Sequence, residues 1–414
     1  MKNFDDFNFD EKISRVLKEI QYEKPTAIQM QAIPKIFEGL DLIASADTGT
    51  GKTGAFMLPI LHLLEKDSIE KLKGKPTTKY IGPRALILVP TRELALQVSE
   101  EAKKYSKYLP YLKTVCIYGG VPYPVQKRAL SSRYDILVAT PGRLIDCLER
   151  KNINLSNIQI MVLDEADRML DMGFIEPVEW IVKATPSNRQ TLLFSATIDG
   201  RVASFSKKLQ KNPFVIKVDA ANVDKPNIEN HLYYVDDLEH KKRLLHHILG
   251  TFEINQAIVF VSTISQTDKL VSYLKENEYS SEALHGDMHQ GQRTRTINKL
   301  RRGAIQILVA TDVAARGIDI LTLSHVINFD LPFRAEDFIH RIGRTGRAGG
   351  KGMALTFATY REEIMLSKIN RLIGQPLKAF QIEGLEPKQK EKRNPAPRRP
   401  QNRFGNKNRP RRRQ

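Results

Sequence analysis

Short aliphatic runs alternate with longer helical patterns along most of the 414 residues, and this alternation restricts the fold more than any other feature. Parallel strands need long crossover connections, so strands separated by helices favour a parallel sheet. Loops at the carboxyl ends of such strands form the ligand site. The predicted strands are residues 41–45, 85–89, 115–118, 136–139, 160–163, 191–194, 257–261, 305–310, 325–329 and 353–357.

The strand–helix rhythm stops once, at a short polar segment interrupted by Pro226, and then restarts. The chain is also too long for one ordinary domain. We therefore predict an α/β fold with two domains, at residues 1–219 and 228–375, joined by a linker at 220–227. Residues 376–414 form an extension that is basic and, from about residue 387, too poor in apolar residues to fold alone.

The net charge is +18, and residues 388–414 contribute 12 Lys or Arg against one acid. Such a basic end indicates a polyanionic partner, although charge alone does not distinguish RNA, DNA and an acidic membrane. No apolar run approaches the roughly 18 residues that span a bilayer. The first ten residues do not resemble a secretory signal either, so we expect a cytoplasmic protein. Cys116 and Cys147 are interpreted as reduced packing thiols.

A Gly-rich segment follows the first predicted strand and opens a helical pattern. It differs from the general phosphate-loop pattern only in starting with Ala instead of Gly. Its glycines let backbone N–H groups face phosphate oxygens, its lysine can reach the β- and γ-phosphates, and its last hydroxyl can bind Mg²⁺. We predict a nucleotide site here rather than a chance Gly-rich turn. The segment consists of Ala46, Asp47, Thr48, Gly49, Thr50, Gly51, Lys52 and Thr53.

Asp164 and Glu165 follow a second apolar run, residues 158–163. A carboxylate at the end of a buried strand can hold the metal that Thr53 also contacts, and its neighbour can orient the attacking water. The letters DEAD, which end at Asp167, also suit an acidic helix cap. The nucleotide site is favoured because the phosphate loop lies about 110 residues upstream, on a separate strand.

The second half contains three arginines at three-residue spacing with interleaved glycines, within residues 340–347. Guanidinium groups in such a segment can stabilise charge on a transferring phosphoryl group, or can grip nucleic acid as a basic turn. These arginines and the phosphate loop belong to different predicted domains. A nucleotide that touched both would draw the domains together.

Taken in order, these segments resemble the motifs of DEAD-box RNA helicases, and the resemblance covers nearly all of residues 4–375. The short amino-terminal arm and basic tail most resemble the bacterial RhlE-type branch. The family implies two tandem RecA-like domains, ATP and Mg²⁺ as cofactors, and RNA as partner. The further matching segments are residues 21–29, 90–95, 119–120, 140–143, 195–197, 259–262, 290–293, 310–312 and 316–319.

The resemblance implies a role for each matching residue of the nucleotide site. Gln29 reads the adenine edge, Phe4 stacks on the base, and Asp319 contacts the nucleotide from the second domain. The residues implied in hydrolysis are Lys52, Asp164, Glu165 and the arginine fingers Arg344 and Arg347. Coupling between the domains is implied for Asp167, Ser195, Thr197, Asp312 and His340, with His340 reaching toward Asp167.

The resemblance also implies that RNA is held through its sugar–phosphate backbone, so little sequence specificity is expected. Contacts to 2′-hydroxyl groups would favour RNA over DNA. The implied RNA-side residues are Thr91, Arg92, Gly120, Thr140, Gly142, Arg143, Ser262, Gln290, Arg293 and Thr311. The chain departs from the family at a few positions: Gln21 stands where Gly is usual, Ala27 where Pro is frequent, Asp47 where Gln is common, and His289 where Ser is typical.

The expected function is that of an ATP-dependent RNA helicase, which binds single-stranded RNA and ATP across two domains and locally separates or remodels duplexes as ATP is hydrolysed. Two alternatives stay open from the sequence. One is an ATP-gated RNA-binding clamp or scaffold, and the other is a DNA-stimulated ATPase. Ribosome-assembly and RNA-decay proteins are candidate partners, and no membrane partner is expected.

Overall fold

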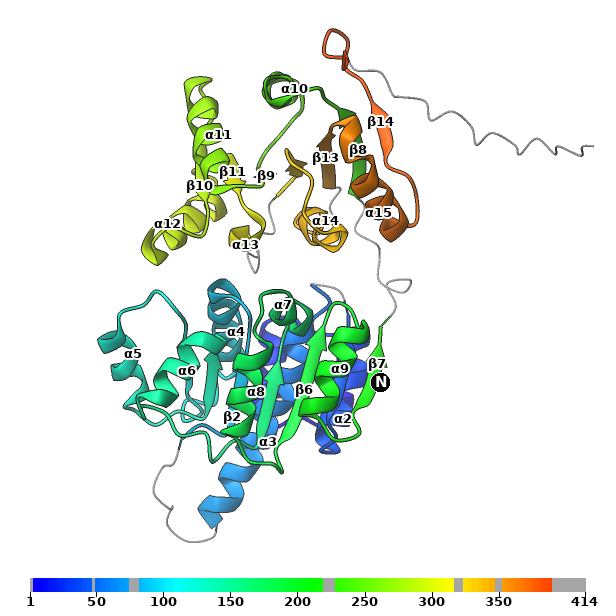
Figure 1. Cartoon of the computed structure of the whole chain (residues 1–414). Helices are drawn as coiled ribbons and strands as arrows, with labels where there is room; N and C mark the ends of the chain where they lie inside the picture. Colours follow the sequence, from blue (N-terminus) through cyan, green and yellow to red (C-terminus); the bar gives the residue numbers. More distant parts are fainter. Residues whose placement is uncertain are drawn as a thin grey trace, which may run out of the picture.

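Two parallel seven-stranded sheets, each flanked by helices on both faces, form the two lobes of the molecule (Figure 1). The computed structural model describes residues 3–46, 49–73, 82–218, 228–315, 323–346 and 352–388. This architecture confirms the predicted α/β fold with two tandem RecA-like domains.

The first sheet has the strand order β3-β4-β2-β5-β6-β1-β7. Every adjacent pair is parallel, so the carboxyl ends of all strands lie along one edge. Its strands are β1 (Leu42–Ser45), β2 (Ala85–Leu88), β3 (Thr114–Ile117), β4 (Ile136–Ala139), β5 (Ile160–Leu163), β6 (Gln190–Ser195) and β7 (Phe214–Lys217).

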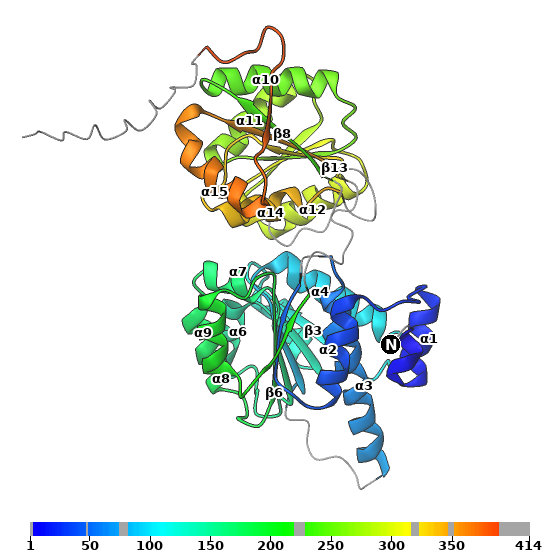
Figure 2. The ribbon, with the colours of Figure 1, turned by 90° about the vertical axis from the view of Figure 1, so that its right-hand side faces the viewer.

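Helices cover both faces of this sheet because β2, β4 and β5 are buried along their whole length. The first four α-helices pack on one face and α5 to α9 on the other (Figure 2). The first face carries α1 (Glu11–Glu19), α2 (Ala27–Phe37), α3 (Lys52–Lys73) and α4 (Arg92–Tyr105), with the short helix η1 (Phe4–Phe7) beside them. The second carries α5 (Tyr123–Leu130), α6 (Pro141–Glu149), α7 (Ala166–Asp171), α8 (Ile175–Lys183) and α9 (Gly200–Leu209).

The second sheet repeats the topology of the first, with the order β10-β11-β9-β12-β13-β8-β14. Counted within each domain, the two strand orders are the same, so the two halves are related by architecture. Its strands are β8 (Ile228–Tyr234), β9 (Ala257–Phe260), β10 (Ser281–Leu284), β11 (Ile307–Ala310), β12 (His325–Asn328), β13 (Gly352–Ala358) and β14 (Lys378–Phe380).

The helices of the second domain also divide between two faces. One face is covered by α10 (Leu238–Thr251) and α11 (Ile264–Glu276). The other is covered by α12 (Gln290–Arg301), α13 (Asp312–Ala315), α14 (Ala335–Ile342) and α15 (Glu363–Ile373), with the short helix η3 (Tyr360–Glu362) leading into α15.

The last strand of each sheet leads out of its domain. β7 ends at Lys217, and the whole predicted linker, residues 220–227, lies outside the described residues. β14 pairs with β8 beyond residue 375, and the chain then reaches α10, where the Lys388 backbone N–H donates to Asp236 at 2.8 Å. The packed part of the second domain therefore extends past the predicted boundary. Nearly all of the predicted disordered tail lies outside the described residues.

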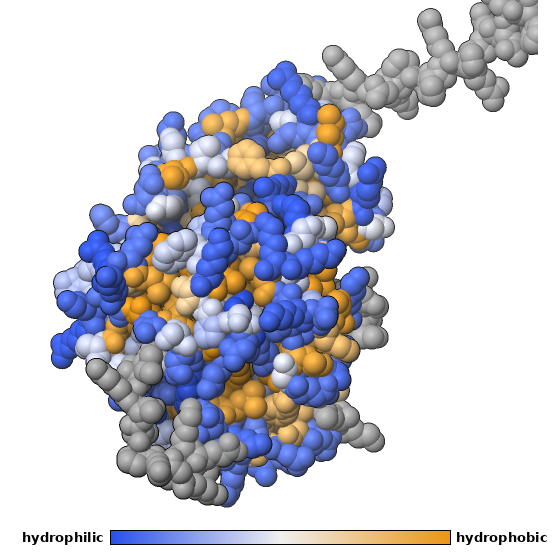
Figure 3. Space-filling model, turned by 60° about the horizontal axis from the view of Figure 1, so that its bottom comes forward, coloured by the Kyte–Doolittle hydropathy of each residue, from blue (hydrophilic) through white to orange (hydrophobic). Residues whose placement is uncertain are grey.

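Polar and charged side chains cover most of the face seen in Figure 3, with apolar patches between them. In the described part of the chain, every helix is either too short or too polar to cross a bilayer. Gln21 has a φ of 58°, the left-handed conformation that favours glycine. This explains why Gly is usual at that position in the family that the sequence resembles.

Candidate nucleotide and RNA site

The phosphate loop lies between the carboxyl end of β1 and the start of α3. Gly49 and Gly51 have φ values of 84° and 89°, which only glycine adopts without strain. A Cβ on Gly51 would also lie 2.7 Å from Nε2 of Gln29, so a larger residue does not fit. Lys52 is buried at the first position of α3, and its Nζ donates to the Ala46 carbonyl at 3.0 Å. Asp47 and Thr48 lie outside the described residues.

One of the residues implied in adenine binding, Gln29, packs beside this loop, and a second, Phe4, lies in η1. Gln29 is buried on α2; its Nε2 donates to the Gly51 carbonyl at 3.1 Å, and its Oε1 accepts from the Thr26 backbone N–H at 2.9 Å. Phe4 is buried in η1, where its ring stacks on Tyr22 with the ring centroids 6.2 Å apart. Gln29 therefore holds the phosphate loop directly, whereas Phe4 belongs to the aromatic cluster under α1.

The two carboxylates that the resemblance implies in hydrolysis, Asp164 and Glu165, follow β5 directly. Burial raises the pKa of Asp164 to about 6, although the nearby Lys52 ammonium lowers it. The Glu165 backbone N–H donates to Asp164 Oδ1 at 2.9 Å. Glu165 itself has a φ of 53°, a left-handed conformation that costs a non-glycine residue about 1–3 kcal/mol and that is frequent at active sites.

Positive groups from both domains surround Glu165. Burial disfavours its charge, but Arg168, Lys52, Arg344 and His340 together hold its pKa below the usual range. Arg168 Nη1 donates to Glu165 Oε2 at 2.9 Å, and both side chains are buried. Lys52 of the first domain and Arg344 of the second therefore both favour the charged form of this carboxylate.

Arg344 is only 7 % exposed and lies just beyond α14, where its Nε donates to the His340 carbonyl at 3.2 Å. The His340 Nδ1 is buried without a hydrogen-bond partner and lies 3.9 Å from the Asp337 carboxylate. Among the described residues, the His340 ring forms no hydrogen bond with Asp167. The other two second-domain residues implied in nucleotide binding, Arg347 and Asp319, lie outside the described residues.

Asp167 joins the end of β5 to the end of β6. Its backbone N–H donates to Ser195 Oγ at 3.3 Å, and its Oδ2 accepts from the backbone N–H groups of Ala196 and Thr197 at 3.1 and 3.3 Å. A shift of either strand end would therefore move the other.

The first-domain residues implied in RNA binding gather at the carboxyl ends of β2, β3 and β4. Thr91 and Thr140 are the N-caps of α4 and α6, and Gly142 lies in the first turn of α6. Helix N-termini present free N–H groups, which suit phosphate. The Arg143 side chain is only 9 % exposed, and its Nη1 donates to the Val121 carbonyl and to Gln126 Oε1. Arg143 thus braces the surrounding loop.

Arg92 connects this surface to the second domain. A Cβ on Gly120, which has a φ of 84°, would lie 2.5 Å from Arg92 Nη1, so the guanidinium packs directly on this glycine. Arg92 Nη1 also donates to Gln290 Oε1 at 3.3 Å, across the interface.

A second link between the domains joins Arg293 to Glu93 at 2.7 Å, with both side chains less than 10 % exposed. Arg293 Nη2 also donates to the Ala314 carbonyl, which fixes the guanidinium. In the same domain, Thr311 is buried beside α13, and the Ser262 backbone N–H donates to Asp330 Oδ2 at 2.9 Å. Thus Arg293 and Gln290 line the interface, whereas Ser262 is held within the second domain.

Asp312 pairs within its own domain. Its two carboxylate oxygens accept from Arg341 Nε and Nη2 at 2.6 and 2.7 Å. Arg341 is almost fully buried and also donates to the Asp330 carbonyl. This bidentate pair ties α13 to α14, so Asp312 connects the RNA side of the second domain to the helix that leads to Arg344.

Sequence reasoning missed a third link between the domains. Asp171, the last residue of α7, forms ion pairs with Arg334 of the second domain and with Arg201 of the first. Asp171 lies on α7, the helix that begins directly after Glu165. Its closeness in sequence to Glu165 was the only feature that could have pointed to a role for Asp171. Glu93 lay inside a recognised motif without an assigned role. Nothing in the sequence singled out Arg334.

Comparisons with known proteins agree with this geometry. The descriptions "DEAD/DEAH box helicase" and "Helicase conserved C-terminal domain" match residues 26–205 and 240–349. The ATP-dependent RNA helicase SrmB of Escherichia coli is 42 % identical over 387 residues, which cover 93 % of this chain and 85 % of SrmB. The chain therefore belongs to the DEAD-box family of ATP-dependent RNA helicases.

Solved structures also match the arrangement of the two domains. S. cerevisiae Dbp5 bound to RNA and ADP BeF3 is 30 % identical and gives a TM-score of 0.80, covering 94 % of this chain and 96 % of Dbp5. A variant of S. cerevisiae Dbp5 bound to a Gle1 variant and IP6 is also 30 % identical and gives a TM-score of 0.70, covering 92 % of this chain and 96 % of that chain. The two lobes therefore sit more nearly as they do in the RNA- and nucleotide-bound form. The chain is an enzyme that binds RNA and couples ATP hydrolysis to RNA unwinding.

Proposed function

We propose that the two domains act as a clamp that closes on ATP and single-stranded RNA, with hydrolysis reopening it. The observation that carries this proposal is the buried ion pair of Arg293 with Glu93 across the interface, together with the effect of both Lys52 and Arg344 on the pKa of Glu165. A ligand shifts such an equilibrium only through its different affinity for the open and closed states. Because ATP and RNA each contact both domains, binding of one favours binding of the other.

In the closed state the phosphate loop cradles the triphosphate, and Lys52 neutralises its β- and γ-phosphates. Glu165 orients the attacking water, with Arg168 fixing the carboxylate at 2.9 Å. Arg344 stabilises the charge that develops on the transferring phosphoryl group, and Arg347 is proposed to assist it. Gln29, Phe4 and Asp319 are proposed to select adenine and hold the nucleotide.

Thr53 and Asp164 would hold Mg²⁺ that arrives with ATP. Hydroxyl and carboxylate oxygens are the ligands that this cation prefers, and the raised pKa of the buried Asp164 fits a carboxylate whose charge a cation would balance. Bound Mg²⁺ neutralises charge on the phosphates. Asp167 then relays the state of this site to Ser195 and Thr197 through the hydrogen bonds at the end of β6.

RNA is proposed to lie along the carboxyl ends of the strands, against the N-termini of α4 and α6 and the start of α12. Such backbone contacts position a strand without reading its sequence. Two experiments test this assignment. Multiple-turnover unwinding of an RNA duplex is expected with ATP and not with a non-hydrolysable analogue. RNA, and not DNA of the same length, is expected to stimulate hydrolysis; equal stimulation by DNA would contradict it.

The resemblance of the motifs and the basic composition of residues 388–414 support placement in the RhlE-type branch. A cytoplasmic location and partners in ribosome assembly or RNA decay are also proposed. Crosslinking of the protein to RNA in cells, followed by sequencing, would test both the branch and the pathway.

The Asp171–Arg334 link predicts a selective effect on closure. Arg334→Ala should raise KM for RNA about two- to fivefold and leave kcat nearly unchanged, because a partly exposed ion pair contributes only about 0.2–1 kcal/mol. RNA-stimulated ATP hydrolysis at varied RNA concentration measures this change. Arg201→Ala is the control, since Arg201 contacts the same carboxylate without crossing the interface. Equal effects of both substitutions would show that Arg334 has no role in closure.

Removal of residues 389–414 is expected to weaken RNA affinity and flatten its salt dependence. For single strands, the logarithm of the binding constant falls with the logarithm of the salt concentration, with a slope of about −0.7 for each phosphate neutralised. The removed segment is strongly basic, so its loss should make this slope less steep. Cutting after Lys388 keeps the contact between its backbone and Asp236. Titrations at several salt concentrations, with a Gly/Ser tail of equal length as control, measure the slope. An unchanged slope would leave the tail without a role in RNA binding.

A further inference from the structure

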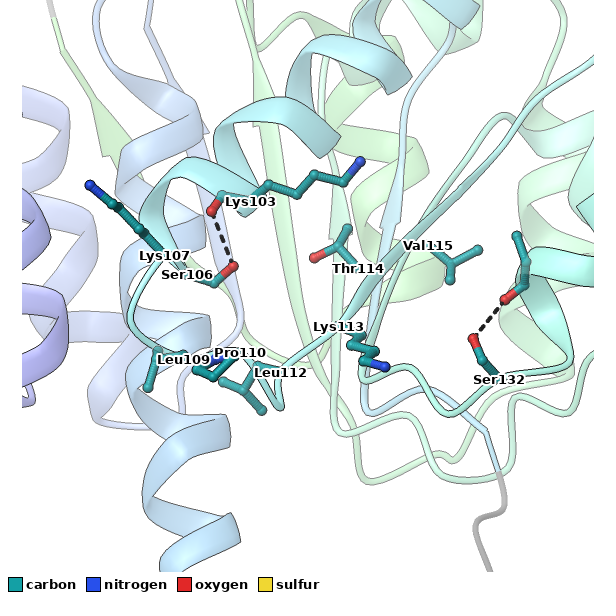
Figure 4. A pocket seen from close by; sticks show the side chains of 11 residues that line it. Lys103, Ser106, Lys107, Leu109, Pro110, Leu112, Lys113, Thr114, Val115 and Ser132 are labelled. Carbon is teal, nitrogen blue, oxygen red and sulfur yellow. Dashed lines mark hydrogen bonds between the residues drawn. The ribbon is translucent and has the colours of Figure 1, made fainter.

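A hollow of about 450 Å³ lies on the first domain beside β3, away from the site described above. The end of α4, the loop that follows it, the start of β3 and the end of α5 line it (Figure 4). The nucleotide and RNA residues lie at the carboxyl ends of the strands, whereas this hollow begins at the amino end of β3. It is therefore separate from the proposed RNA path.

One wall of the hollow is an open sheet edge. β3 is the outermost strand and pairs only with β4. The carbonyls of Lys113 and Ile117 accept hydrogen bonds from the β4 side. Because successive residues of a strand bond in opposite directions, the backbone groups of Thr114 and Cys116 face outward. Such an edge can pair with another extended chain.

The side chains around this edge are a mixture of basic and apolar groups. Lys103 and Lys113 are both exposed and extend beside the start of β3, whereas Lys107 points away from them and pairs with Glu19 (Figure 4). No acidic residue is among the described residues that line the hollow. Leu109 and Leu112, which are both buried in the core, form its apolar wall.

The start of β3 also offers an unused hydrogen-bonding group. The Thr114 hydroxyl is shielded from solvent and has no hydrogen-bond partner among the described residues. A shielded polar group without a partner is costly, and an added chain could satisfy it.

We propose that this hollow docks an extended acidic segment of a partner protein, which adds to the sheet as a strand beside β3. Main-chain hydrogen bonds to Thr114 and Cys116 would provide affinity, and carboxylates beside Lys103 and Lys113 would provide specificity. RNA is a poorer fit, because the described residues that line the hollow include no aromatic ring for bases to stack on. This interaction goes beyond the proposed helicase mechanism and uses none of its residues.

The test uses the full-length protein and a library of displayed random 12-residue peptides. Peptides are selected on the wild-type protein in the presence of excess K103E/K113E protein in solution. Net acidic sequences with alternating apolar residues are expected. Fluorescein-labelled synthetic copies should bind the wild-type protein at least about 10-fold more tightly than the K103E/K113E variant. K151E/K183E is the control with the same change in charge at two exposed lysines outside the hollow, and it should bind as the wild type does.

N-methylation distinguishes strand addition from simple charge attraction. Methylating every second peptide amide should abolish binding in one register and be tolerated in the other, because only alternate N–H groups face β3. Equal tolerance in both registers would overturn the proposal, and so would failure to recover any peptide that depends on the two lysines. A loss of more than about 10-fold in affinity for a 12-nucleotide RNA in K103E/K113E would also overturn it, by showing that the hollow binds RNA.

Discussion

Glu165→Gln is expected to lower kcat for RNA-stimulated ATP hydrolysis by about 10²–10⁴-fold, the range typical of a residue that positions or activates the attacking group. The substitution keeps the size of the side chain and an oxygen that can accept from Arg168, so the local structure should persist. The affinities for ATP and for RNA should stay within about threefold of the wild-type values. Single-turnover hydrolysis and equilibrium binding measure the two effects separately.

Glu176→Gln is the matched control, because it removes the same charge from an exposed position on α8. This variant should hydrolyse ATP at the wild-type rate. A Glu165→Gln enzyme that turned over at that rate would contradict the role assigned to Glu165.

Arg344→Ala is expected to abolish most RNA-stimulated turnover, with a loss of about 10³-fold or more, the size seen when an arginine finger is missing. ATP affinity in the absence of RNA should change little, because the phosphate loop belongs to the other domain. The structural reason is the position of Arg344, which is buried and close enough to Glu165 to lower its pKa. Steady-state hydrolysis with and without RNA measures the effect.

Arg361→Ala provides the comparison, since Arg361 is an exposed arginine of the same domain. If RNA stimulated the Arg344→Ala enzyme as strongly as it stimulates Arg361→Ala, Arg344 could not act as a finger. The contacts within the first domain would then have to account for catalysis alone.

Both predictions rest on residues that local sequence patterns revealed, and this shows which parts of the molecule a sequence can specify. The phosphate loop follows a largely apolar strand and Asp164 follows a fully apolar one, so their position at a strand end could be read directly. The repeated order of aliphatic runs likewise predicted two parallel sheets. The phosphate loop, Asp164 and the strands are each defined by residues that are adjacent in the sequence, so the sequence alone is enough to predict them.

Four strands were not among those predicted: β7 at the edge of the first sheet, and β8, β10 and β14 at or near the edges of the second. β10 and β14 are short and partly exposed, so they lack the continuous apolar run of a central strand. β8 carries polar residues in its first half and begins directly after the linker. Edge strands need fewer apolar residues, so apolar pattern alone does not identify them.

The links between the domains could not be predicted for another reason. Glu93 and Arg293 are 200 residues apart, and Asp171 and Arg334 are 163 apart. Their pairing depends on how the two domains face each other. Family resemblance supplied the expectation that the domains meet, but the partners that join them required coordinates.

The central claim is that ATP and RNA close the two domains together, and the distance between the domains tests it most directly. Ser131→Cys on the first domain and Glu276→Cys on the second, in a background with Cys116 and Cys147 replaced by Ala, would carry spin labels at exposed positions. Distances are then measured by pulsed electron paramagnetic resonance in four states: free, with a non-hydrolysable ATP analogue, with single-stranded RNA, and with both. We predict that the distribution shifts to a single closed distance only with both ligands. The same distribution in all four states would contradict the clamp.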